Sequence, residues 1–86
     1  MAGLTVSLVS ADQEVWSGEA SMVVARTTEG EIGLLAGHEP MLAILGDGEV
    51  RLTTAEGVIR VNAANGFVSF ENDSVTIVAR QAELIS

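Results

Sequence analysis

The chain has 86 residues, enough for one small domain, and 48% of them are hydrophobic, so the composition allows one modest core. Twelve acidic residues stand against four arginines and no lysine, a formal net charge of −8. This charge excludes the basic face of a nucleic-acid binder and disfavours anionic lipid, while the absence of cysteine excludes disulfides and thiolate metal sites.

The first half of the chain predicts short strands around one irregular loop. Alternating or β-rich segments predict strands at 4–9, 15–18 and 20–27. Trp16, within the second of these, belongs either to the core or to an exposed interface. Three glycines, the only histidine and the only proline fall within Glu29–Pro40, which predicts an ordered excursion of the backbone. The apolar run 40–45 fits either a short helix or a buried strand.

The second half predicts strands joined by tight turns. Strands are expected at 49–54, 58–61, 67–70 and 74–79, with turn signals at Glu56-Gly57, Asn65-Gly66 and Asn72-Asp73. Asn65-Gly66 is the strongest hairpin signal, since a type I′ turn needs positive φ at both central residues. Strands spaced by eight to twelve residues indicate an all-β sandwich or barrel. Residues 80–86 are instead good helix formers.

The sequence offers little for catalysis. One histidine and no cysteine leave only carboxylates as metal ligands, and no calcium-loop spacing occurs. Phosphate-loop, dinucleotide-binding and nucleophile-elbow motifs are also missing. Glu29, Glu31 and Glu39 could act as acids or bases in principle, but acidic side chains on such a surface are mostly solvated. We therefore expect no catalytic residue, no metal and no cofactor. No apolar run approaches the ~20 residues of a membrane helix, and no signal peptide is expected.

Four segments resemble a known family in the right order. Residues 10–12 and 15–20 resemble its opening, in which an aromatic residue precedes Ser-Gly. Residues 28–42 read Thr-Glu-Gly-Glu-Ile-Gly-Leu-Leu-Ala-Gly-His-Glu-Pro-Met-Leu and resemble its signature, although Ala36 stands where the family usually has proline. Residues 65–67 resemble its Gly-Gly-Phe, and 75–83 resemble the segment that ends its sandwich. The family is the ε subunit of the bacterial F-type ATP synthase, in its N-terminal β-sandwich domain.

The resemblance implies a fold and a function. The fold would be a flattened two-sheet β-sandwich or barrel of about ten short strands, forming one domain over 1–86. A helical domain could begin near 80–86, but the C-terminal helical hairpin, with its inhibitory function, would be missing. The function implied is that of a non-catalytic central-stalk subunit, which clamps γ to the c ring and couples proton translocation to ATP synthesis. The protein would be peripheral, on the cytoplasmic face of the bacterial plasma membrane.

The resemblance also implies contact residues, which we carry over by position. Glu29, Gly30, Glu31 and Ile32 correspond to contacts with the c ring. Ser10, His38, Met41 and Leu42 correspond to contacts with γ. An exposed apolar patch would adjoin the Glu29–Ile32 loop and could let isolated copies self-associate. The alternative is a free-standing acidic β-sandwich that binds a peptide or small ligand, a role for which three aromatic residues equip the chain poorly.

Overall fold

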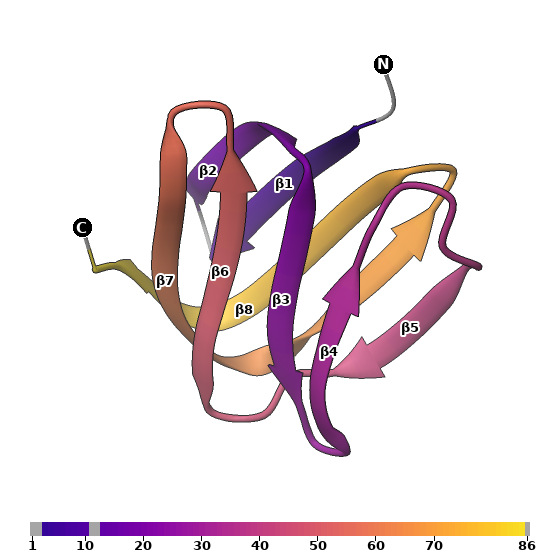
Figure 1. Ribbon diagram of the computed structural model, residues 1–86. Coiled ribbons are helices and arrows are strands. Elements are labelled where there is room, and N and C mark those ends of the chain that lie inside the picture. The colour runs from indigo at the N-terminus through magenta and orange to yellow at the C-terminus, as the bar shows by residue number, and fades with distance from the viewer. Residues whose placement is uncertain (1–2, 11–12, 86) are drawn as a thin grey trace.

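The computed structural model describes residues 3–10 and 13–85, which form eight β-strands and no helix (Figure 1). In chain order these are β1 (Leu4–Ser10), β2 (Gln13–Ala20), β3 (Met22–Thr27), β4 (Gly30–Leu34), β5 (Met41–Ile44), β6 (Gly48–Thr54), β7 (Gly57–Glu71) and β8 (Ser74–Leu84). The all-β prediction is confirmed. The strands number eight in the described residues rather than about ten, because segments expected as separate strands merge into the long β7.

One continuous, open sheet folds over on itself to make the two layers. Its strands are hydrogen-bonded in the order β2-β1-β8-β7-β6-β3-β4, and β5 also pairs with β7. The first half of β7 pairs with β6 and its second half with β5. One layer therefore holds β3, β4 and β6, the other holds β1, β2 and β5, and the long strands β7 and β8 run through both (Figure 1).

The corner between the layers lies at Asn65 and Gly66, where the sequence predicted a hairpin. That prediction is wrong, because β7 continues through both residues and keeps one register with β8 on either side. Asn65 does adopt a left-handed φ of 62°, which asparagine tolerates. Here this φ bends the strand, so the buried positions change phase between Ala63 and Val68. The sequence therefore predicts the left-handed conformation of Asn65 correctly, but Gly66 has no positive φ and the chain does not reverse.

The core lies between the layers and is almost entirely aliphatic. Trp16 packs against the core and remains partly exposed, so it is neither a fully buried core residue nor a fully exposed interface residue. The buried hydrophobic residues are Leu4, Val6, Leu8, Ala20, Val23, Ala25, Leu34, Leu45, Val50, Leu52, Val61, Ala63, Val68, Phe70, Val75, Ile77 and Ala79.

Two segments that the sequence allowed or favoured as helix are strands instead. Residues 41–44 form β5 and, instead of being a buried strand, leave Leu42 and Ile44 exposed. Residues 80–84 continue β8 despite their helical propensity, since Leu84 pairs with Val61 and the Ile85 amide donates to the Arg60 carbonyl at 2.9 Å. Pairing with a formed strand outweighs a helix preference too short to act alone.

Candidate interaction surfaces

The turn between β3 and β4 presents Glu29 to solvent. The Oγ1 of Thr27, a buried residue, donates a hydrogen bond to the Gly30 carbonyl at 2.7 Å and accepts one from the Glu29 amide at 3.1 Å. These bonds hold the turn from within, because the buried hydroxyl binds both the amide of Glu29 and the carbonyl of Gly30. Glu29 and Gly30 are both exposed. We call residues 27–30 the acidic tip.

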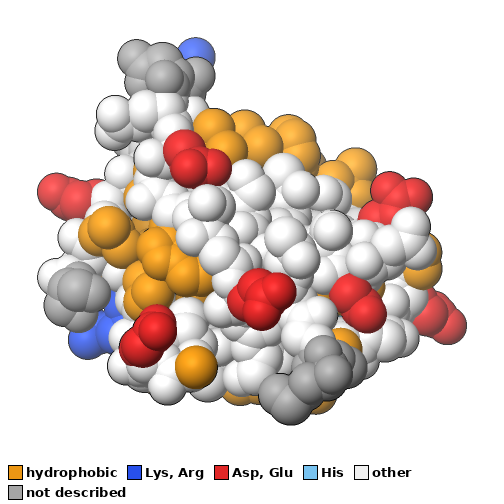
Figure 2. All heavy atoms as spheres, turned by 90° about the horizontal axis from the view of Figure 1, so that it is seen from above, with side chains coloured by type: hydrophobic (Ala, Val, Ile, Leu, Met, Phe, Trp, Pro, Cys, Tyr) orange, Lys and Arg blue, Asp and Glu red, His pale blue; other side chains and the backbone are white. Residues whose placement is uncertain are grey.

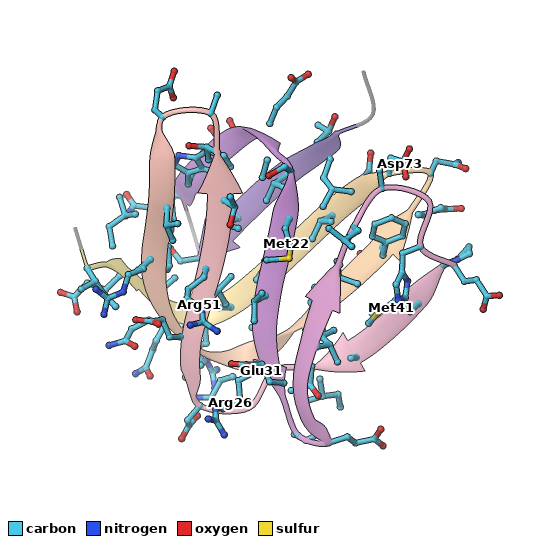
Figure 3. All side chains as sticks on the ribbon, viewed as in Figure 1. Met22, Arg26, Glu31, Met41, Arg51 and Asp73 are labelled. Atoms are coloured by element: carbon cyan, nitrogen blue, oxygen red, sulfur yellow. The ribbon has the colours of Figure 1, made fainter. Side chains whose placement is uncertain are left out.

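Glu31 and Ile32, the other two predicted ring contacts, lie on β4 beyond the tip. The Oε2 of Glu31 accepts a hydrogen bond from the Nη2 of Arg51 on β6 at 3.3 Å, across the outer face of the sheet (Figure 3). Both side chains are about half exposed, so this pair contributes little to stability. Ile32 instead packs against the core. Of the four predicted ring contacts, only Glu29 and Gly30 therefore lie in the acidic tip itself.

A second turn repeats the acidic tip at the other end of the molecule. Residues 27–30 and 54–57 both read Thr-x-Glu-Gly. The Oγ1 of Thr54 donates to the Gly57 carbonyl at 2.7 Å and accepts from the Glu56 amide at 3.2 Å, as in the first turn. Because β3 and β6 are antiparallel, the two turns lie at opposite ends of the same layer (Figure 1). The repeated tetrapeptide could have revealed this equivalence from sequence.

His38, Met41 and Leu42 lie together where the chain enters β5, and we call them the shoulder. The His38 ring meets the Phe70 ring edge to face, with centroids 5.3 Å apart. Met41 pairs with Phe70 in the sheet and is partly buried. Leu42 is 70% exposed. The structure therefore brings three of the four predicted γ contacts together.

A hydrogen bond from the next hairpin supports the loop that carries the shoulder. The Gly37 amide donates to Oδ1 of Asp73 at 2.7 Å, and Asp73 lies in the turn between β7 and β8 (Figure 3). Asp73 is absent from the sequence-based candidates. Its contact with Gly37 joins residues 36 positions apart, and no local pattern indicates such a contact.

Apolar side chains continue from the shoulder across one layer; those on β5 and Phe67 are exposed, and those of Val78 and Val9 are half-buried. Leu42 and Ile44 are on the outer face of β5, and Ile44 is paired with Phe67 of β7. Phe67 is paired with Val78 of β8, which is paired with Val9 of β1. We call these five residues the apolar stripe. It reaches the acidic tip, because the Thr28 amide donates to the Ile44 carbonyl at 2.9 Å.

Ser10, the fourth predicted γ contact, lies at the far end of this stripe. It follows Val9 on β1, three strands away from β5, which corresponds to roughly 14 Å across the sheet. Ser10 borders an open hollow of about 660 Å³ that Arg80 and Glu83 also line. The apolar stripe thus runs from the shoulder to the neighbour of Ser10. Ala11 and Asp12, which belong to the same part of the resemblance, lie outside the described residues.

Acidic side chains outnumber basic ones over the rest of the described surface. Seen from above, acidic groups are spread over the surface, with hydrophobic side chains gathered in patches between them (Figure 2). Within residues 3–10 and 13–85 no three or more His, Asp or Glu side chains are grouped to hold a metal ion. The same residues contain no helix that could cross a membrane. The fold defines a small β-sandwich module.

Comparisons with known proteins identify the family of this module. Residues 3–85 match the family model described as "ATP synthase, Delta/Epsilon chain, beta-sandwich domain". The ATP synthase epsilon chain of Micrococcus luteus is 52% identical over 85 residues, which cover 98% of this chain and 93% of that protein. The epsilon chain of Streptomyces griseus is 50% identical over 84 residues, which cover 96% of this chain and 68% of that longer protein.

Solved structures agree with the sequence comparisons. A chain in the Euglena gracilis mitochondrial ATP synthase, in a structure titled "OSCP/F1/c-ring in rotational state 1", matches with a TM-score of 0.90 and 25% identity. A chain in the Tetrahymena thermophila structure titled "central stalk/cring" has the same fold, with a TM-score of 0.77 and 16% identity. The present chain spans 54% and 65% of these two chains, respectively.

The chain therefore belongs to the ATP synthase delta/epsilon β-sandwich family, as its resemblance implied. Its curated relatives are ATP synthase epsilon chains, which are subunits of an assembly. These relatives give no support to the alternative of a free-standing binding module.

Proposed function

We propose that this protein is a non-catalytic subunit of the central stalk of a rotary ATP synthase, where it clamps γ to the c ring. It would work on the cytoplasmic face of the bacterial plasma membrane, as a peripheral part of that membrane-associated complex. The names of its relatives and the central-stalk title of a fold neighbour support this role. By transmitting torque between the ring and γ, the subunit would couple proton translocation to ATP synthesis.

The observation that carries the proposal is the direct connection between two surfaces of different chemistry. The apolar stripe suits a stable protein contact, because burying apolar area is favourable in proportion to that area. The acidic tip suits a partner with basic and amide side chains. Thr28 of the tip and Ile44 of the stripe are hydrogen-bonded to each other, so both contacts would be carried by one stiff structure.

We assign the two surfaces to the two partners. Glu29 and Gly30 would meet the c ring, with Glu31 and Ile32 supporting them from β4. The shoulder and the apolar stripe would meet γ, and Ser10 would extend this contact at the stripe's far end. The tight Thr27 bonds would keep the tip from deforming under load.

The acidic tip offers a test with a matched control. Glu29→Lys should weaken recovery of the c ring about three- to tenfold, since a new positive charge would face a basic surface. Glu56→Lys makes the same charge change in the same type of turn at the other end of the molecule. We expect it to leave ring binding unchanged. Recovery of the detergent-solubilised ring by immobilised γ–ε complex measures both variants.

Stability and γ binding serve as internal references in that experiment. Both glutamates are exposed and outside any ion pair among the described residues, so neither variant should shift the unfolding midpoint measurably. An equal loss of c-ring recovery in both variants would mean that the net charge of the subunit, and not the position of Glu29, determines ring binding. Full recovery with Glu29→Lys would remove the tip from the ring contact.

A further inference from the structure

Asp73 joins three parts of the fold that are far apart in the sequence. Its carbonyl oxygen accepts a hydrogen bond from the Thr5 amide of β1 at 2.9 Å. Its Oδ1 accepts the Gly37 amide, in the loop between β4 and β5, at 2.7 Å. Asn72 and Asp73, the predicted turn between β7 and β8, have φ of 51° and 57°, and positive φ at both central residues is typical of a type I′ turn. The carboxylate is therefore fixed on a tight hairpin.

Asp73 holds a particular kind of turn. The His38 amide donates to the Leu35 carbonyl at 3.1 Å, and Gly37 has a φ of 89°. Ala36 has no positive φ, so residues 35–38 form a type II turn, which needs glycine at its third position. The turn's own hydrogen bond leaves the Gly37 amide free, and Asp73 accepts from it.

The second position of this turn lacks its usual restraint. Proline is common at that position in type II turns, because its ring presets the φ the turn requires. Ala36 occupies it here, so the unconstrained chain has more conformations to lose when the turn forms. The hydrogen bond from Gly37 to Asp73 restrains this turn from outside, through the β7–β8 hairpin. A proline would restrain it from within.

We propose that Asp73 is a positioning residue for the shoulder, holding the 35–38 turn so that His38, Met41 and Leu42 meet γ in one arrangement. This inference rests on the proposed function in its assignment of the shoulder to γ. Asp73 itself acts through Gly37. Its carboxylate lowers the cost of ordering the loop on binding, and a preorganised loop binds more tightly than a mobile one.

Two substitutions separate the hydrogen bond from the turn that carries it. Asp73→Gly keeps a residue that accepts positive φ but removes the acceptor. Asp73→Asn removes the charge but keeps both the acceptor and the tolerance for positive φ. In the full chain, we expect the Gly37 amide to exchange with solvent about three- to tenfold faster in Asp73→Gly and near the wild-type rate in Asp73→Asn. NMR measures this rate, and Asp73→Asn corrects for the effect of charge on exchange.

The affinity for γ should fall when the 35–38 turn is less ordered. The dissociation constant of the complex with the cognate γ subunit, measured by calorimetry, should rise about three- to tenfold for Asp73→Gly and stay near wild type for Asp73→Asn. Adding Ala36→Pro to Asp73→Gly should restore most of the affinity without restoring the acceptor. A merely structural role for Asp73 would not give this rescue.

The possible failures are distinguishable. Unchanged Gly37 exchange in Asp73→Gly would show that the bond does not order the loop. Faster exchange with unchanged γ affinity would remove Asp73 as a positioning residue and leave the proposed function standing. A wild-type chain that does not bind γ would instead overturn the proposed function, and the role of Asp73 toward γ with it.

Discussion

Gly66 occupies a position where a single added methyl group has no room. A Cβ at this residue would collide with the carbonyl oxygen of Val78 and lie 2.6 Å from Cα of Ala79, both backbone atoms of β8. Gly66→Ala should therefore lower the free energy of unfolding by about 3 kcal/mol, since backbone atoms cannot move aside as a flexible side chain can. Urea denaturation measures the change.

Gly33 supplies the control for that prediction. A Cβ there would meet nothing within 4 Å, and its φ is not positive. Gly33→Ala should leave stability within about 0.5 kcal/mol of wild type. If the two alanine variants proved equally stable, the close approach of β7 and β8 at the corner would be wrong.

Residue-level signals in the sequence predict backbone conformation better than chain path. Asn72-Asp73 was predicted to turn the chain and does so with positive φ at both residues. Asn65 also has the predicted positive φ, but β5 and β6 pair with the two halves of β7 along one edge, so the strand bends without reversing. That outcome depends on strands distant in the sequence. The Asp73–Gly37 bond is unpredictable for the same reason.

At the scale of the element, β5 is short and has two of its four apolar residues on the outside. Leu42 and Ile44 are 70% and 62% exposed. Leu42→Gln should weaken binding to γ about tenfold, because the side chain would no longer bury apolar area in the contact. Its effect on stability should be negligible, since little of that area is buried in the free domain. Calorimetric titration with γ tests this.

Val58 is the matched control for Leu42. It lies on β7 in the part that pairs with β6, outside the apolar stripe, and is 53% exposed. Val58→Gln should bind γ as the wild type does. An equal loss of affinity in both variants would mean that the stripe is not the specific contact.

Elements were predictable where one face is buried and less so elsewhere. Residues 4–9 and 49–54 alternate in polarity and form β1 and β6 nearly as predicted. The tail 80–84 carries helix-forming residues, yet Leu84 has a β7 partner in Val61. The sequence did not decide the structure of run 40–45, because a strand with exposed apolar side chains has the same composition as a buried strand.

For the whole molecule, charge and apolar area should separate the two proposed contacts. The net charge of −8 includes the exposed Glu29 of the acidic tip, whereas the stripe is uncharged. Raising the salt from ~0.05 to ~0.5 M shortens the screening length severalfold. Ring binding should then weaken several-fold, while γ binding should change less than twofold. Equal salt dependence of the two dissociation constants would contradict the assignment of tip and stripe.

The parallel pairing of β1 with β8 places a constraint on how the protein is made. Thr5 pairs with Ser74, so the first and last strands must meet in the middle of the sheet. During synthesis at roughly 5–20 residues per second, β1 and β2 would emerge seconds before β8. Until then one edge of β1 has no partner, and pairing across such a sequence separation is slow. Local pairs such as β1 with β2 and β3 with β4 could form earlier, but the sheet cannot be completed until nearly the whole domain has left the ribosome.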